Sequence, residues 1–175
     1  DFSNEIPNVA IHDLKIQAKA KELIVGTHGR SIYKIDISKV QQLKSSVLEK
    51  PIYLFDINNR TKSERWGTQN YAWGKVMEPS QQIWFYSDSD DEGVVLVSSE
   101  TGIEVFSKKI SIKKGLNSFT YNYTMSKGAA AEWNKKHKKN TISVSQNNSY
   151  YLPVSKYNFK IVKGKTSATT TFELT

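Results

Sequence analysis

Acidic residues crowd into one short stretch, and carboxylates at this spacing could bind a metal ion. Asp88, Asp90 and Glu92 occupy alternate positions just before Gly93. A calcium-binding loop begins in this way, because Ca²⁺ takes oxygen ligands. The twelfth position of such a loop would be Ser99 rather than glutamate, and the flanking residues have the pattern of strands. An acidic hairpin turn is therefore the favoured interpretation, with calcium as the alternative and no other cofactor expected.

A second group of residues has the composition of a carbohydrate-binding surface. Trp66, Tyr71 and Trp73 lie in a long segment between two predicted strands, and Arg65 is their neighbour. Aromatic faces beside planar polar side chains can contact sugar rings, and loops of this length often carry function. The alternative is that these rings pack over the domain or against another part of the protein.

Residues 126–139 combine three alanines and Trp133 with a lysine-rich end at residues 135–139. Alanine favours a helix, and basic residues are favourable in its last turn. A patch for phosphate or an anionic polysaccharide is one interpretation. A solvated helix end with Trp133 packed inward is the favoured one.

The residue types needed for nucleophilic or acid–base catalysis form no recognisable pattern. His12, His28 and His137 are the three histidines, and the chain has no cysteine. Disulfide, thiol and zinc–thiolate chemistry are thereby excluded. We expect these residues to be non-catalytic by themselves.

The net charge of +8, from 25 basic and 17 acidic residues, could indicate an anionic partner. The lysines are spread along the chain, however, and arginines occur only at positions 30, 60 and 65. A solvated, lysine-rich surface is therefore favoured, and no nucleic acid is expected as a partner. No apolar run approaches the ~20 residues that span a membrane.

The elements that position these residues follow from the alternation of apolar and polar side chains. Three strands are predicted near the N-terminus, at residues 9–16, 23–26 and 32–37. One sheet of this size cannot bury its own apolar face. We therefore expect it to be one unit of a repeat fold. In the present chain it should pack on the remaining residues, pair with a second copy of the chain or be poorly ordered.

The rest of the chain predicts a different architecture. Residues 38–50 are polar, with Val40, Leu43 and Val47 at helical spacing, and are predicted to be a linker. Residues 51–175 contain about seven short strands separated by turn residues, as in Greek-key sandwiches of the immunoglobulin type. The strands are predicted near residues 52–57, 82–86, 94–97, 103–112, 117–123, 157–162 and 168–174. The predicted fold class is all-β: an immunoglobulin-like β-sandwich preceded by a small antiparallel sheet.

The string Val25–Tyr33 contains Thr27, His28, Gly29 and Arg30 in succession. Together with Pro7-Asn8-Val9 and His12-Asp13-Leu14, it resembles the last blade of propellers built from BNR-type repeats. Such propellers occur in sortilin-like (VPS10-type) proteins and in bacterial proteins classed as glycosyl hydrolases. The Asp-box signature of these repeats is absent, because Thr27 stands at the position of its aspartate.

Three turn motifs in the second half carry a further resemblance, at residues 100–102, 114–117 and 152–157. They are similar to those of the immunoglobulin-like C-terminal domains, related to the flagellar-hook-capping fold, that follow such propellers in secreted bacterial proteins. Ser155 stands where that family commonly has glycine. The order of the two resemblances, blade and then sandwich, is more specific than either alone.

The resemblance implies a partial last blade at residues 1–37, a linker at 38–50 and a sandwich at 51–175. It implies a non-catalytic accessory module of a secreted, surface or periplasmic protein, with the upstream propeller of the same polypeptide as its partner. One alternative is a carbohydrate-binding module that contacts polysaccharide through the aromatic segment. Another is a fragment that contributes His28 and Arg30 to a glycosidase site in the propeller.

Overall fold

A computed structural model describes residues 8–175, and its secondary structure is nearly all-β, as predicted. The chain divides into two compact units, residues 1–47 and residues 48–175. The division falls within the polar segment 38–50. The first unit is small and the second holds the main hydrophobic core, and each is described by itself.

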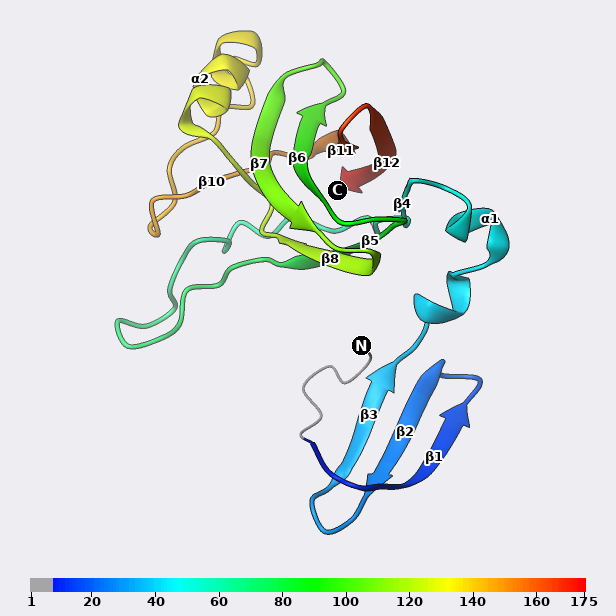
Figure 1. Cartoon of the computed structure of the whole chain (residues 1–175). Coiled ribbons are helices and arrows are strands. Elements are labelled where there is room, and N and C mark those ends of the chain that lie inside the picture. Colours follow the sequence, from blue (N-terminus) through cyan, green and yellow to red (C-terminus); the bar gives the residue numbers. More distant parts are fainter. Residues whose placement is uncertain (1–7) are drawn as a thin grey trace. The chain divides into compact units, whose positions relative to one another are not determined.

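The first unit is a three-stranded antiparallel sheet in the order β1-β2-β3 (Figure 1). Its strands are β1 (Ile11–Gln17), β2 (Glu22–Thr27) and β3 (Ile32–Asp36). The three strands predicted in this region are thus present. Two short helical turns follow, η1 (Val40–Gln42) and α1 (Ser45–Leu48), where the sequence predicted a linker with helical spacing.

This sheet has one apolar face, which follows from the register of its strands. Leu14, Val25 and Tyr33 lie opposite one another across the three strands, and Ile16, Leu23 and Ile35 form the next such row. Residues directly opposite in a ladder share a face. Val25 at the centre is 2 % exposed, whereas Leu14 and Ile16 on the edge strand are 58 % and 61 % exposed. The apolar face is therefore open to water along β1, whereas its residues on β2 and β3 are buried or half-buried.

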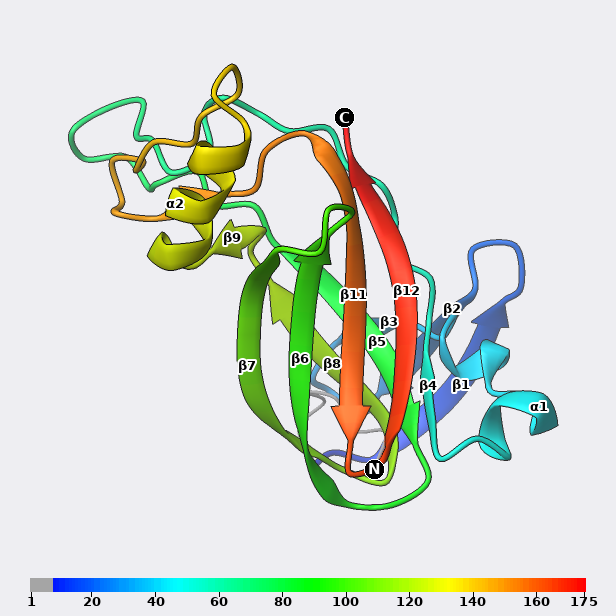
Figure 2. The same cartoon turned by 90° about the horizontal axis from the view of Figure 1, so that it is seen from above.

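The second unit is a sandwich of two antiparallel sheets (Figure 2). One sheet has the order β4-β5-β8 and the other β12-β11-β6-β7. The strands are β4 (Ile52–Leu54), β5 (Gln81–Ser87), β6 (Asp91–Ser99), β7 (Glu104–Ile112), β8 (Gly115–Tyr121), β11 (Ser155–Lys163) and β12 (Thr166–Leu174). The first, second and fifth of these strands form one sheet, and the third, fourth, sixth and seventh form the other, which is an immunoglobulin-like arrangement.

Aromatic side chains dominate the core between the two sheets. Tyr121, Tyr157, Phe159 and Phe172 are buried there, and the rings of Tyr157 and Phe172 stack with centroids 5.3 Å apart. The Tyr157 hydroxyl donates a hydrogen bond of 2.7 Å to the carbonyl of Pro153, just before β11. This is the tyrosine corner that marks many immunoglobulin-like sandwiches. Burial raises the pKa of Tyr157 above its ordinary value, so the hydroxyl stays protonated and can donate.

An insertion between β8 and β11 contains β9 (Thr124–Met125), the helix α2 (Lys127–Lys136) and β10 (Tyr150–Tyr151). Ser126 caps the helix, since its Oγ accepts a hydrogen bond of 3.1 Å from the amide of Ala129. Trp133 is buried in the core, as the sequence predicted. Its indole Nε1 donates to the carbonyl of Asn140.

Candidate functional site

The long segment between β4 and β5 contains the four residues predicted to contact sugar, and the structure separates them. Trp66 is 5 % exposed, and its ring stacks on that of Tyr123 at a centroid distance of 5.6 Å. The guanidinium of Arg60 lies 5.9 Å from the centre of the same indole. The assignment of Trp66 to a sugar-binding surface is therefore wrong, because its ring belongs to the hydrophobic core.

The chain beyond Trp66 forms a loop at residues 67–77, which we call the aromatic loop. Its base is closed by two backbone hydrogen bonds, from Gly67 N to Met77 O at 2.8 Å and from Met77 N to Thr68 O at 2.9 Å. Gly67 has a φ of +77°, and a Cβ added there would lie 2.5 Å from the Cβ of Ser145. A glycine is required at this position, both for its backbone conformation and for the close approach.

A distant turn, residues 145–149, fixes this loop from outside. Asn147 N donates to the carbonyl of Gly67 at 3.2 Å, and Gln69 N donates to Oε1 of Gln146 at 3.1 Å. The side-chain amide of Asn147 also donates to Glu78 Oε1 at 2.9 Å. Two insertions far apart in the sequence are thus joined by hydrogen bonds on both sides of the loop base.

Tyr71 and Trp73 lie on the outer part of the aromatic loop. Tyr71 is 64 % exposed and Trp73 is 86 % exposed, and their rings stack with centroids 5.3 Å apart and planes 11° from parallel. The amide of Gly74 donates to the carbonyl of Tyr71, which sets the turn between the two rings. Arg65, the fourth predicted residue, is exposed and donates from Nη2 to the side-chain oxygen of Asn70. The structure therefore keeps Tyr71 and Trp73 as a pair, with Arg65 bonded to the residue that precedes Tyr71.

The predicted calcium-binding carboxylates are engaged by lysines. Asp88 forms an ion pair with Lys163, and this hydrogen bond is the main reason that the pKa of Asp88 lies below its ordinary value. Asp90 accepts a hydrogen bond of 2.7 Å from the backbone amide of Lys114 and one of 3.3 Å from Nζ of Lys113. Both hydrogen bonds lower the pKa of Asp90 below its ordinary value, and the one from the backbone amide of Lys114 has the larger effect.

Glu92, the third predicted ligand, is exposed near the start of β6. Within residues 8–175 there is no group of three or more His, Cys, Asp or Glu side chains that could hold a metal ion. The expected acidic hairpin turn is also wrong, because β5 and β6 belong to different sheets and the acidic stretch crosses between them.

Lys163 is a feature that the sequence analysis missed. It is 6 % exposed, and its Nζ lies within 3.1 Å of the Pro51 carbonyl and 2.8 Å of both the Ser87 and the Ser89 hydroxyls, in addition to Asp88. The signal was present, because Tyr157, Phe159 and Ile161 point into the core at every second position and Lys163 continues that series. The strand predicted at residues 157–162 ends one residue short of it.

The blade-signature residues form the turn between β2 and β3. The Thr27 hydroxyl donates to the carbonyl of Ser31 at 2.6 Å, and the amide of Ser31 donates back to Thr27 Oγ1 at 3.0 Å. The amide of His28 donates to the carbonyl of Ala10, and the His28 ring stacks on that of His12 at 4.7 Å. Gly29 and Arg30 occupy the exposed tip of the turn. The two Thr27–Ser31 bonds close the turn, and the His28 contacts join it to residues 10–12 at the start of β1.

The lysine-rich end of α2 is solvated, as the sequence predicted. Lys135, Lys138 and Lys139 are exposed, and Lys136 pairs with Glu132 at 2.9 Å. The ring of His137 stacks on Trp133 at 3.9 Å, so this histidine covers the buried indole.

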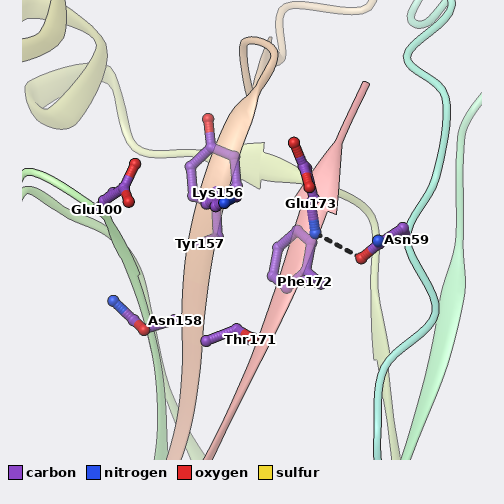
Figure 3. A pocket seen from close by; sticks show the side chains of 8 residues that line it. All are labelled: Asn59, Glu100, Lys156, Tyr157, Asn158, Thr171, Phe172 and Glu173. Carbon is purple, nitrogen blue, oxygen red and sulfur yellow. Dashed lines mark hydrogen bonds between the residues drawn. The ribbon is translucent and has the colours of Figure 1, made fainter.

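A hollow of about 250 Å³ lies along the strands β11 and β12 (Figure 3). Its polar lining comes from Asn59, Glu100, Lys156, Asn158, Thr171 and Glu173. The side-chain oxygen of Asn59 accepts a hydrogen bond of 2.9 Å from the backbone amide of Glu173. This bond joins the segment after β4 to the edge strand β12. No local pattern of residues predicts this hollow, because its lining comes from four separate segments.

No protein-family model matches the chain, and no curated protein shows significant similarity to it. Among the described residues, no helix has the length and apolar character needed to cross a membrane. The fold and the exposed residues therefore carry the functional argument.

Proposed function

We propose that this chain is a non-catalytic accessory module of a secreted protein that resembles the BNR-type propeller glycosyl hydrolases. In this proposal the sheet β1–β3 is the last blade of the propeller. The immunoglobulin-like sandwich is the closing module that follows the blade. The partner of the sheet is the upstream propeller of the same polypeptide.

The observation that carries the proposal is the open apolar face of the first sheet. Leu14 and Ile16 on β1 are more than half exposed although they share a face with the buried Val25. Exposing aliphatic side chains costs about 25 cal/mol per Å² of apolar surface, so a face of this kind is usually covered by another element. Blades of a propeller cover one another in this way, because each packs its faces against its neighbours.

The other face of the sheet is more polar. Lys15 and Lys34 flank Ile24 in one row, and Gln17, Glu22 and Asp36 form the next. Lys34 also pairs with Glu22 at 2.8 Å. Ile32, at 74 % exposed, lies on this face too, so the need for a covering element is argued from Leu14 and Ile16 on the opposite face.

Hydrogen exchange tests the proposal on two polypeptides, the present chain and the full gene product, which under this proposal carries further propeller strands before residue 1. We expect the amides of residues 11–36 to exchange faster in the present chain, because the apolar face lacks its cover. The double variant Leu14→Lys/Ile16→Lys should speed exchange in the longer polypeptide. The matched control Gln17→Lys, on the opposite face of the same strand, should not.

Equal protection of residues 11–36 in both polypeptides would overturn the proposal. A gene product without upstream strands would do the same. Concentration-dependent protection in the present chain alone would instead assign the face to self-association, which light scattering would reveal as a dimer.

A further inference from the structure

We infer that Tyr71 and Trp73 form a binding site for a neutral polysaccharide whose sugar rings present a flat apolar face, as in cellulose or chitin. This inference goes beyond the accessory role proposed above. It depends only on residues of the sandwich unit and so stands independently of the first sheet.

The first support is the contrast in burial among tryptophans of the same unit. Trp66 and Trp133 are both buried in the core, whereas Trp73 is 86 % exposed. A tryptophan side chain carries 150–250 Å² of largely apolar surface, so leaving it in water forgoes a large hydrophobic gain. Tyr71 covers only one of its faces. The outer face of the indole remains available for a ligand.

The second support is the rigidity of the loop that presents the rings. Its backbone is fixed at several points. Two hydrogen bonds close the loop base, residues 145–149 bond to it from outside, and Gln69 Nε2 donates to Gly74 O at 3.0 Å within the loop. A surface that is held in place before binding loses little conformational entropy when it binds.

The geometry of the pair defines where a ligand would lie. The ring centroids are 5.3 Å apart and nearly parallel. A sugar between them would need two van der Waals contacts of about 3.5–4 Å each, so it cannot enter. The ligand must therefore stack on the outer face of Trp73, with Tyr71 supporting the indole from behind.

The small area of the Tyr71–Trp73 surface and its low net charge indicate which class of ligand it can bind. Two rings offer at most a few hundred Å², well below the ≈ 800 Å² that each partner contributes to a standard protein–protein interface. Single-stranded nucleic acid also stacks on aromatic rings, but it requires a basic groove along the backbone. Here Arg65 and Lys75 are balanced by Glu64 and Glu78. One apolar ring face with little net charge fits a neutral sugar best.

Hydrogen-bonding groups for sugar hydroxyls are available next to the rings. The exposed side chains of Asn70 and Gln69 precede Tyr71, and the Tyr71 hydroxyl is itself a donor and acceptor. The amide of Asn70 keeps its donor hydrogens while its oxygen accepts from Arg65. A ring face with planar polar neighbours can therefore both stack and orient a sugar.

The test measures binding of cellohexaose and chitohexaose by tryptophan fluorescence, and retention on insoluble cellulose and chitin. We expect binding in the millimolar range or tighter for at least one of them. Trp73→Ala should weaken it by roughly tenfold or more, which corresponds to about 1.4 kcal/mol. Trp73→Phe should retain most of it, since a ring face remains. The thermal midpoint should be unchanged in both variants, because Trp73 contributes nothing to the core.

Val144→Ala is the matched control, since Val144 is also exposed and lies one residue before the turn that supports the loop. It should bind as the wild type does. Failure of Trp73→Ala to change binding would overturn the inference, as would the absence of binding to all four materials. Binding of oligothymidine through Trp73 with equal affinity would overturn it in favour of a nucleic-acid site.

Discussion

At the scale of single residues, Lys163 shows how one buried cation organises the end of the sandwich near Asp88. Its ammonium group joins the backbone before β4, the end of β5 and the crossing that follows β5. Burying a charge is unfavourable unless it is paired and hydrogen-bonded, and here four oxygen atoms surround an ammonium group that has three hydrogens to donate. The acidic stretch thus has a structural role where a calcium site was considered.

The Lys163–Asp88 pair predicts a pH dependence of stability. The pKa of Asp88 is lower in the folded protein than its value of 3.8 in an unfolded chain, mainly through the hydrogen bond from Lys163. Its stabilising contribution is therefore fully present above the unfolded pKa and is lost as the pH falls through the folded pKa. We expect the thermal midpoint to decrease below about pH 4 in the wild type, and to decrease less in Asp88→Asn.

Lys163→Met gives a second measurement of the same pair, because it removes the partner and leaves Asp88 in place. Its pH dependence should be flattened as in Asp88→Asn. At neutral pH it should also be less stable by about 1–3 kcal/mol, since the buried Ser87 hydroxyl loses its donor. Lys160→Met, on the exposed side of the same strand, is the control. A pH profile identical to wild type in both Asp88→Asn and Lys163→Met would contradict this account.

At the scale of elements, the joined insertions depend on one close approach at Gly67. We predict that Gly67→Ala destabilises the protein more than Gly102→Ala. Both positions have φ near +80°, so each substitution costs about 1–2 kcal/mol of backbone strain. A Cβ at Gly102 meets nothing within 4 Å, whereas one at Gly67 meets Ser145 and the ring of Tyr151. Denaturant unfolding of the two variants gives the difference, and equal losses would show that the close approach is not tight.

The sequence predicted the strands well because their signal is local. Alternation with period two follows from which side chains face the core, and it appears in β11 without any knowledge of neighbouring strands. Which strands pair is not local. The acidic stretch looked like a hairpin, but β5 leads into the opposite sheet, and only packing decides that.

The candidate site was predictable only in part for a similar reason. Trp66 and Trp73 are seven positions apart and share the same polar neighbours, so composition could not distinguish the buried ring from the exposed one. Burial of Trp66 depends on Tyr123 and Arg60, which come from other segments. The stacking of Tyr71 on Trp73, in contrast, is a property of the loop itself, but the composition of the segment did not predict it.

At the scale of the whole molecule, the buried core cluster lies entirely within residues 52–174. We therefore predict that residues 51–175 fold without the first sheet. Limited trypsin digestion should cut after Lys44, within the polar segment 38–50, and release a resistant fragment, whereas Lys50 is protected from trypsin by the proline that follows it. That fragment should keep the cooperative thermal transition of the sandwich, measured by circular dichroism. Loss of the transition in a recombinant 51–175 chain would show that the sandwich needs the preceding residues.

The bonds between the aromatic loop and residues 145–149 also bear on how this surface could be transplanted. Gln69 and Gln146, which join the two segments, are 77 positions apart in the sequence. A graft of residues 64–78 alone into another sandwich would carry both rings but leave behind the amide groups that fix their direction. Only a graft that takes the two insertions together would transfer the surface as a unit, and the same coupling would constrain how either insertion can change in evolution.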